Sequence, residues 1–158
     1  MEVSRTPARI KPPRILAGRR VGLLGGSFNP AHDGHLHISR LALKALDLDE
    51  IWWLVSPQNP LKSSDEMASF EDRFARAAEV AAPERRIRVS DFETRLGTRY
   101  TADTIEQLLK RHKRQRYVWI MGADNLIQIP RWQRWTYLSQ CARCGFRPAL
   151  LFLSLIHI

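Results

Sequence analysis

The sequence predicts an α/β fold, in which a parallel β-sheet carries helices on both of its faces. Short apolar runs, typical of buried strands, alternate with longer segments whose apolar residues recur every three or four positions, as in helices. Strands and helices that alternate in this way form βαβ units with right-handed crossovers, and hence a parallel sheet. The 158 residues suffice for one such domain with its own core.

The first predicted strand is the apolar run of residues 20–25, which ends in glycines and is followed by a helix over residues 34–46. A second buried strand covers residues 51–55. Residues 56–62 after it contain two prolines, which predict a stiff loop. Together these segments form the first strand, helix and strand of the sheet.

The next helix is predicted over residues 63–82, because apolar residues recur there at three- or four-residue steps. At its start Ser63 precedes Glu66 by three positions, which resembles a capping box. Residues 87–89 are predicted as a third strand, and residues 90–100 as a polar connection.

The last predicted helix covers residues 101–112, with Thr101 or Asp103 as its capping residue. A fourth strand follows over residues 117–121, and residues 122–125 form a turn at its carboxyl end. In parallel sheets, ligands gather outside the carboxyl ends of the strands. We therefore expect the functional site at the turns that follow the first, second and fourth strands.

Charge and composition narrow the classes of partner. The net charge of +9 would suit nucleic-acid binding, but the basic residues are spread along the chain and are not interleaved with aromatic residues. A small polyanionic substrate explains the charge equally well. The chain shows no apolar run of membrane-spanning length and no secretory signal, and its two cysteines fit a reducing compartment. We expect a cytoplasmic protein without a membrane partner, and its oligomeric state stays open.

The chain divides into three predicted regions. Residues 1–19 hold five basic residues and three prolines, which predict a flexible basic arm. Residues 20–139 form the predicted domain, and residues 140–158 form a divergent apolar tail.

The segment of residues 25–35, GGSFNPAHDGH, is the main candidate site. Glycines after a strand let the backbone approach a phosphate closely, and the following helix offers free N–H groups to an anion. His32 and His35 are three residues apart, so they can face the same way, and an imidazole N–H can donate to a phosphoryl oxygen. A zinc site would need further ligands. By its spacing His37 points elsewhere, and Asp33 is the only acidic residue nearby. Phosphate contact is therefore favoured over metal binding.

The same segment resembles the signature of the HxGH nucleotidyltransferase superfamily, whose fold is Rossmann-like. Three later parts of the chain are similar to the bacterial nicotinate-nucleotide adenylyltransferases within it. They are the proline loop at 56–62, the Phe-Glu-Thr and Tyr-Thr-Ala-Asp-Thr motifs at 92–104, and the Gly-Ala-Asp-Asn turn and tryptophan motif at 120–135. The resemblance spans about residues 21–138. The HxGH element alone is shared by pantetheine-phosphate adenylyltransferases, cytidylyltransferases and class I tRNA synthetases.

The resemblance implies adenylyl transfer from ATP, accompanied by Mg²⁺, to nicotinate mononucleotide. It implies that His32 and His35 are the catalytic residues, which hold phosphate oxygens and stabilise the transition state. The ATP-binding residues that it implies are Gly25, Gly26, Ser27, Phe28, His32, His35, Gly122 and Asp124. The residues that it implies for nicotinate mononucleotide are Asn29, Lys62, Tyr100, Thr101, Trp132 and Gln133.

Other residues are expected to have structural roles. Trp52 and Trp53 are predicted in the core, and the helix face that carries Arg73 is explained equally well by contact with solvent. Glu93 and Asp103 are expected to orient a loop or cap a helix, without a catalytic role.

The resemblance ends before the end of the sequence. Members of the family carry a second signature, Ile-Ser-Ser-Thr-x-x-Arg, which contacts ATP phosphates, and no segment of this sequence resembles it. We therefore expect a truncated or aberrant C-terminal part, an uncovered sheet edge, and weak or absent catalysis. Two alternatives stay open, namely adenylyl transfer to phosphopantetheine and nucleic-acid binding by a non-catalytic basic fragment.

Overall fold

The protein is described here by a computed structural model. It describes residues 18–57, 67–98, 100–121, 129–132, 136 and 146–150, with no account of the side chains at 129 and 146–150. The strands are β1 (Arg20–Gly26), β2 (Glu50–Val55), β3 (Ile87–Ser90), β4 (Arg116–Met121) and β5 (Phe146–Leu150). The helices are α1 (Asp33–Ala45), α2 (Phe70–Ala81), α3 (Phe92–Leu96), α4 (Thr101–Arg111) and the 3₁₀ turn η2 (Ile129–Arg131).

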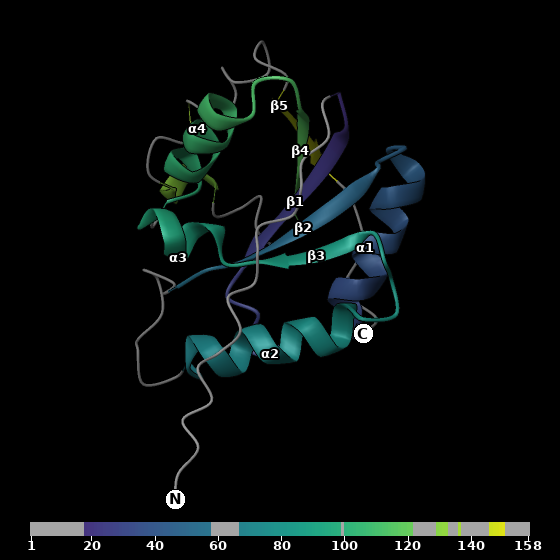
Figure 1. The fold of residues 1–158 in the computed structure, drawn as a ribbon, viewed down its shortest axis with the longest axis vertical. Helices are drawn as coiled ribbons and strands as arrows, with labels where there is room; N and C mark the ends of the chain where they lie inside the picture. Colours follow the sequence, from purple (N-terminus) through teal and green to yellow (C-terminus); the bar gives the residue numbers. More distant parts are fainter. Residues whose placement is uncertain are drawn as a thin grey trace, which may run out of the picture.

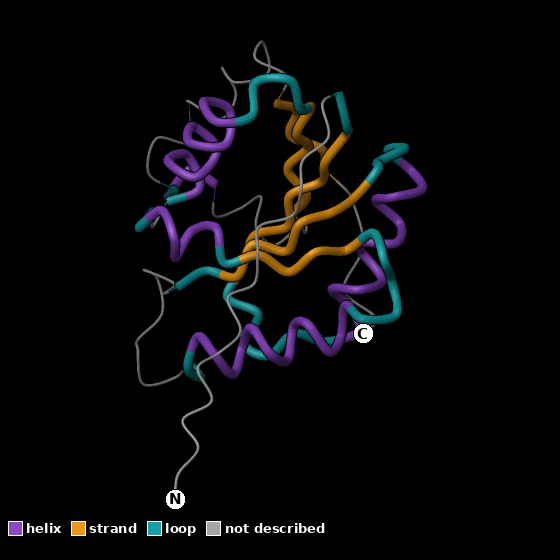
Figure 2. The backbone as a smooth tube through the Cα atoms, in the orientation of Figure 1, coloured by secondary structure: helices purple, strands orange, loops and turns teal. Residues whose placement is uncertain are grey.

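The five strands form one parallel sheet in the order β3-β2-β1-β4-β5, with helices on both faces (Figure 1). One face packs against α1 and α2, which contribute Ala42 and Ala77 to its core. The opposite face is covered by α3 and α4 (Figure 2). Ile105 and Leu108 of α4 are among the side chains packed there. The predicted fold class is confirmed.

Neighbouring tryptophans show how β2 serves both layers. Successive side chains of a strand point to opposite faces. Trp52 is 2% exposed and packs on the α3–α4 side, whereas Trp53 is 0% exposed and packs on the α1–α2 side. Both were predicted as core residues, and both predictions are confirmed.

The strand order places the end of β1 at the switch point of the sheet. Two crossovers, through α1 and α2, lead from β1 to β2 and β3 on one side, and the chain then returns to β4 on the other side. In such sheets the ligand crevice lies where the direction of winding reverses, at the carboxyl ends of the two central strands. That point is the carboxyl end of β1 and β4, where the segment of residues 25–35 begins with the last two residues of β1.

The second helix begins later than predicted. Met67, Ala68 and Ser69 are not helical, and α2 starts at Phe70 with the Ser69 hydroxyl accepting from the Asp72 N–H at 3.1 Å. The predicted start at Ser63 is therefore wrong, because Ser69, six residues further along, caps the helix. The expected partner Glu66 lies outside the described residues.

The connection between β3 and α4 contains a helix that the sequence pattern did not predict. The five residues of α3 are too few to show a helical period, and the helix ends at Gly97, whose φ of +67° suits a left-handed C-cap. Tyr100 is the N-cap of α4 and makes no side-chain capping bond, so the prediction of Thr101 or Asp103 as the cap is wrong. Both residues lie inside the first turn of the helix.

The edge of β4 is covered by β5. Its register runs from Tyr117 opposite Phe146 to Met121 opposite Leu150, parallel to β4. The fourth strand is therefore not the edge of the sheet, because residues 146–150 form a strand that the sequence pattern did not predict. The expectation of an uncovered sheet edge, which now concerns β5, stays a prediction. The division of the chain into arm, domain and tail stays a prediction. Within the described ranges, we find no helix with the length and apolar character needed to span a membrane.

Candidate active site

The two histidines of the HxGH segment cap the start of α1. His32 is the N-cap, and its Nδ1 accepts from the Gly34 N–H at 3.0 Å. His35 returns the contact, because its Nδ1 accepts from the His32 N–H at 3.1 Å. Capping satisfies N–H groups that have no partner within the helix. The three-residue spacing therefore fixes both rings relative to the helix, which the sequence did not predict.

The same hydrogen bonds assign the protons of the two rings. A neutral imidazole carries one proton, so a nitrogen that accepts a hydrogen bond leaves the proton on the other nitrogen. Since Nδ1 accepts in both His32 and His35, Nε2–H is the remaining donor of each ring, and it donates to no group in the described ranges. The ring centroids are 4.1 Å apart. The site thus presents two N–H donors side by side at a helix N-terminus, which suits an anion.

His35 is held in its neutral form. Burial lowers the pKa of His35 to about 4, and the charge of His32 acts in the same direction. Its ring lies 4.8 Å from the Phe28 ring and 5.9 Å from the Trp53 ring, measured between centroids. At neutral pH it is therefore a hydrogen-bond donor and not a cation.

A chain of hydrogen bonds anchors the backbone of His35 to the core. The indole N–H of Trp53 donates to the Ser39 hydroxyl at 2.8 Å, and that hydroxyl donates to the His35 carbonyl oxygen at 2.8 Å. Trp53 and Ser39 are both 0% exposed. The backbone of His35 is therefore held by two buried side chains that cannot move without disturbing the core.

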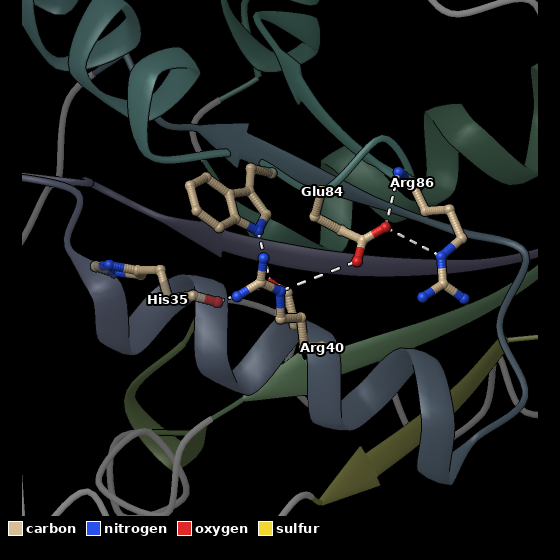
Figure 3. A network of polar contacts seen from close by, with 6 residues as sticks. His35, Arg40, Glu84 and Arg86 are labelled. Atoms are coloured by element: carbon tan, nitrogen blue, oxygen red, sulfur yellow. Dashed lines mark hydrogen bonds and ion pairs between the residues drawn. The ribbon is translucent and has the colours of Figure 1, made fainter. Parts of the chain in front are cut away.

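Arg40, in the middle of α1, forms an ion pair with Glu84 in the loop before β3. Glu84 lies between Arg40 of α1 and Arg86, at 4.0 Å and 3.1 Å (Figure 3). The hydrogen bond from Arg86 is the largest of the effects that lower the pKa of Glu84. Because the arginines are half exposed, these pairs add little to stability.

The turn between β1 and α1 has a strained residue at its centre. Phe28 has φ of +48°, in the left-handed region that side chains other than glycine disfavour by roughly 1–2 kcal/mol. Its ring is 2% exposed and stacks on Trp53 at 5.2 Å. The buried ring offsets the backbone strain and holds the turn in one conformation. Asn29 supports the turn too, because its Oδ1 accepts from the Ala68 N–H at 3.1 Å.

Gly25 and Gly26 end β1 and serve different purposes. A Cβ on Gly25 would lie 2.6 Å from the Trp119 ring, so a larger residue would displace that indole. A Cβ on Gly26 would lie in ordinary contact with Phe28, 3.7 Å from its ring and 4.0 Å from its backbone nitrogen, and Gly26 is exposed. Gly26 therefore leaves backbone open to a ligand, whereas Gly25 makes room for a neighbouring strand.

Trp132 lies on the α3–α4 side of the sheet. It is half buried, and its ring meets that of Trp119 edge-on, with centroids 6.5 Å apart. Because Trp119 in turn fills the space above Gly25, Trp132 is linked by packing to the end of β1.

A buried carboxyl group supports the start of α4. Glu93 is 6% exposed, and its Oε1 accepts from the Thr104 hydroxyl at 3.2 Å. Thr104 also meets Thr98 at 3.0 Å and the Tyr100 carbonyl oxygen at 3.2 Å. This network orients the segment of Tyr100 and Thr101, as expected for Glu93.

Glu93 is expected to make stability depend on pH. Burial raises the pKa of Glu93 to about 7 from an ordinary 4.5, and the bond from Thr104 acts in the opposite direction. The folded protein then binds more protons than the unfolded chain between these values, so this stability is present below pH 4.5 and lost as pH rises through about 7. Relative to Glu93→Gln, the wild type should lose on the order of 2–3 kcal/mol of unfolding free energy between pH 5 and pH 8.

Urea unfolding of both proteins at each pH measures that difference. The opposing contribution of His35, whose pKa is lowered, is present in both chains and cancels. Parallel pH profiles for wild type and Glu93→Gln would contradict the assignment.

Sequence similarity places this site in a known family. The sequence model described as cytidylyltransferase-like matches residues 23–146, which include β1, the HxGH segment and the sheet around them. The chain belongs to the cytidylyltransferase-like family.

Two relatives of this cytidylyltransferase-like chain carry the name of the adenylyltransferases that its motifs resemble. The "Probable nicotinate-nucleotide adenylyltransferase" of Parvibaculum lavamentivorans is 63% identical over 134 residues, which are 85% of this chain and 66% of the relative. The protein of the same name from Erythrobacter litoralis is 60% identical over 123 residues, 77% of this chain and 55% of the relative. The chain thus spans less than two thirds of either relative.

A solved structure supports the fold of this cytidylyltransferase-like chain. The nicotinic acid mononucleotide adenylyltransferase of Plasmodium falciparum, complexed with NaAD, matches with a TM-score of 0.69 and 16% identity. The match covers 86% of this chain and 76% of that one. At this identity the likeness is evidence for the fold alone.

The structure of this cytidylyltransferase-like chain brings part of the predicted site together. Gly26, Phe28, His32 and His35 meet around the turn after β1, and Asn29 faces the start of α2. Tyr100, 37% exposed, and Thr101 lie at the start of α4. The predicted site residues outside the described ranges are Lys62, Gly122, Asp124 and Gln133.

One important residue was missed. Arg73 is 2% exposed and donates to the Ser27 carbonyl oxygen, so contact with solvent, which the sequence left as an equally good explanation of its helix face, is excluded. The error has a physical reason, since carbonyl acceptors from distant segments leave no mark on helical periodicity. His37, in contrast, is exposed as expected.

Proposed function

We propose that the site transfers the adenylyl group of ATP to nicotinate mononucleotide, which gives nicotinic acid adenine dinucleotide and pyrophosphate. The observation that carries the proposal is the pair of Nε2–H donors on His32 and His35, at a helix N-terminus and at the switch point of the sheet. The choice of acceptor is supported by the names of the relatives and by the motifs they share with this chain.

In the proposed reaction the 5′-phosphate of the mononucleotide attacks the α-phosphorus of ATP, and pyrophosphate leaves with the electrons of the broken P–O bond. The nucleophile arrives on the substrate, so the protein needs no nucleophile or general base of its own. Its task is to position the two reactants and to stabilise charge on the phosphoryl oxygens. Neutral donors such as His35 suit that task, because they stabilise developing charge without transferring a proton.

ATP would bind along the end of β1. Gly26, Ser27 and Phe28 offer backbone or hydroxyl donors there, while Gly25 acts by leaving space for Trp119. The turn at 122–125 is proposed to complete the ATP site through Gly122 and Asp124, which suits hydrogen bonds to ribose hydroxyls.

Nicotinate mononucleotide would bind beside ATP, at the start of α4. Backbone N–H groups near Thr101 and Gln133 are proposed to receive the nicotinate carboxylate, and Trp132 to stack on the pyridine ring. Tyr100 and Lys62 are proposed to contribute to the same site. Asn29 is assigned a supporting role, because its side-chain oxygen already accepts from Ala68.

Magnesium is proposed to enter with ATP. In the described parts of the chain, no three His, Cys, Asp or Glu side chains gather as a metal site. The ion would therefore be held by the phosphate oxygens of ATP, where it supplies Lewis-acid stabilisation of the leaving pyrophosphate. We also propose a cytoplasmic location, where ATP is available.

Acceptor preference tests this proposal. Pyrophosphate release is measured with Mg²⁺ and ATP, in the presence of nicotinate mononucleotide, nicotinamide mononucleotide or phosphopantetheine. The protein is used in excess over ATP, so that a single turnover suffices to detect pyrophosphate. Nicotinate mononucleotide should give the fastest release.

Two outcomes would contradict the proposal. Preference for phosphopantetheine would identify a different adenylyltransferase. Salt-sensitive binding of single-stranded or duplex nucleic acid, without binding of ATP, would identify a basic nucleic-acid-binding protein instead.

A further inference from the structure

Arg73 connects three segments that are far apart in the sequence. From α2 its Nη1 donates to the carbonyl oxygens of Ser27 at 2.7 Å and Ser56 at 2.8 Å. Its Nη2 donates to the Pro57 oxygen at 3.0 Å, and its Nε to the Ala68 oxygen at 3.0 Å. The side chain thus joins the turns that follow β1 and β2 to the segment that precedes α2.

The four acceptors explain why an arginine occupies this position. A guanidinium presents its donors in a rigid planar fork, whereas the three donors of a lysine radiate from one atom. Carbonyl oxygens that converge from three segments on one plane match the fork. Arg73 is 2% exposed, so these bonds form away from bulk water, and its Cζ lies 5.6 Å from the centre of the Phe70 ring.

The bond to Ser27 determines the direction of a candidate phosphate donor. In a trans peptide the carbonyl and the N–H of the next residue point in opposite directions. Because the Ser27 oxygen points toward Arg73, the Phe28 N–H points away from it. That N–H donates to no other described residue, and Phe28 has the strained φ of +48°. Rotation of this one peptide would relieve the strain and turn the donor away.

The charge of Arg73 is not neutralised by an ion pair with any carboxylate in the described parts of the chain, since its donors meet carbonyl oxygens. Burial lowers the pKa of Arg73, and Glu71 acts through space in the opposite direction. A positive charge that is poorly screened by water raises the potential of its surroundings, so it favours an anion at the turn beside it.

We propose that Arg73 is a positioning residue, which holds the Ser27–Phe28 peptide in its donor orientation and attracts phosphate to the turn after β1. This inference rests on the proposed function, because the proposed function places a phosphate at that turn. Arg73 acts through the backbone and touches no substrate.

Substitutions of Arg73 separate its charge from its hydrogen bonds. Arg73→Met removes both, whereas Arg73→Lys keeps the charge but not the planar fork. The control is Arg76→Met, one turn along α2, where the exposed side chain pairs with Glu79. Calorimetry with inorganic pyrophosphate measures affinity, and NMR measures the ¹³C carbonyl shift of Ser27 and the amide shift of Phe28.

The expected results differ between the variants. Arg73→Met should bind pyrophosphate at least about tenfold more weakly and move the Ser27 and Phe28 signals, because the Phe28 N–H would no longer donate to the charged phosphate. Arg73→Lys should show an intermediate affinity with moved signals, and Arg76→Met should match the wild type within about twofold. Wild-type affinity in Arg73→Met, or unchanged signals in Arg73→Lys, would overturn the inference.

The NMR measurement keeps the inference separate from the proposed function. A wild-type protein that binds no pyrophosphate contradicts the proposed function. The Ser27 carbonyl signal of Arg73→Lys then still decides whether Arg73 holds the peptide. If Arg73→Met does not fold, the same signal in Arg73→Lys decides the matter, because the lysine variant keeps the buried charge.

Discussion

Replacing His35 with alanine is expected to weaken ATP binding about 10- to 150-fold, because one donor to a charged phosphate is removed. Adenylyl transfer should slow by about 100- to 1,000-fold, the usual cost of losing one donor that stabilises transition-state charge. Nε2–H of His35 is the free donor of a neutral ring, so no lost cation contributes to the effect. Calorimetry and single-turnover product formation measure the two quantities.

His37→Ala is the matched control for this prediction. His37 lies on the same helix, two positions further along, and its side chain is exposed. The control should keep ATP affinity and transfer rate within about twofold. Similar losses in His35→Ala and His37→Ala would remove the basis for a specific phosphate contact.

Replacing Trp53 with alanine is expected to lower the free energy of unfolding by about 3–5 kcal/mol, the usual cost of removing a large buried aromatic side chain. Trp53 is 0% exposed, stacks on Phe28 and donates to Ser39, which in turn holds the His35 carbonyl. Urea unfolding measures the loss. ATP binding should weaken as well, because the support of His35 is removed.

Trp53→Phe separates the two parts of that contribution. It keeps an aromatic ring against Phe28 and removes the indole N–H, so the loss should be about 1–2 kcal/mol. Equal losses in Trp53→Ala and Trp53→Phe would mean that the hydrogen bond to Ser39, and not packing, accounts for the stability.

The fold was predictable because the strands are strongly apolar and alternate with helical segments. Burial of β2 on both faces makes Trp52 and Trp53 core residues, and parallel strands place the turn after β1 at the ligand-binding edge. The phosphate role of His32 and His35 stays a proposal, which the sequence already suggested because a glycine turn before a helix start favours anions.

Long-range contacts account for most of what was missed. Arg73 meets carbonyl oxygens of Ser27 and Ser56, which are 46 and 17 positions away along the chain, and no local pattern records such contacts. The start of α2 was misplaced for a similar reason, because Asn29 binds the Ala68 N–H just before the helix. Local patterns report periodicity and turns, whereas the support of this site comes from segments that meet only in the fold.

The fate of the α-phosphate tests the proposed chemistry most directly. The protein, in excess, is mixed with Mg²⁺, ATP labelled at the α-phosphorus and nicotinate mononucleotide, and the products are separated by chromatography. Attack at the α-phosphorus predicts that the label appears in nicotinic acid adenine dinucleotide and that the released pyrophosphate is unlabelled. Label that stays in ATP, or that is released as AMP at a rate independent of nicotinate mononucleotide, would contradict adenylyl transfer at this site.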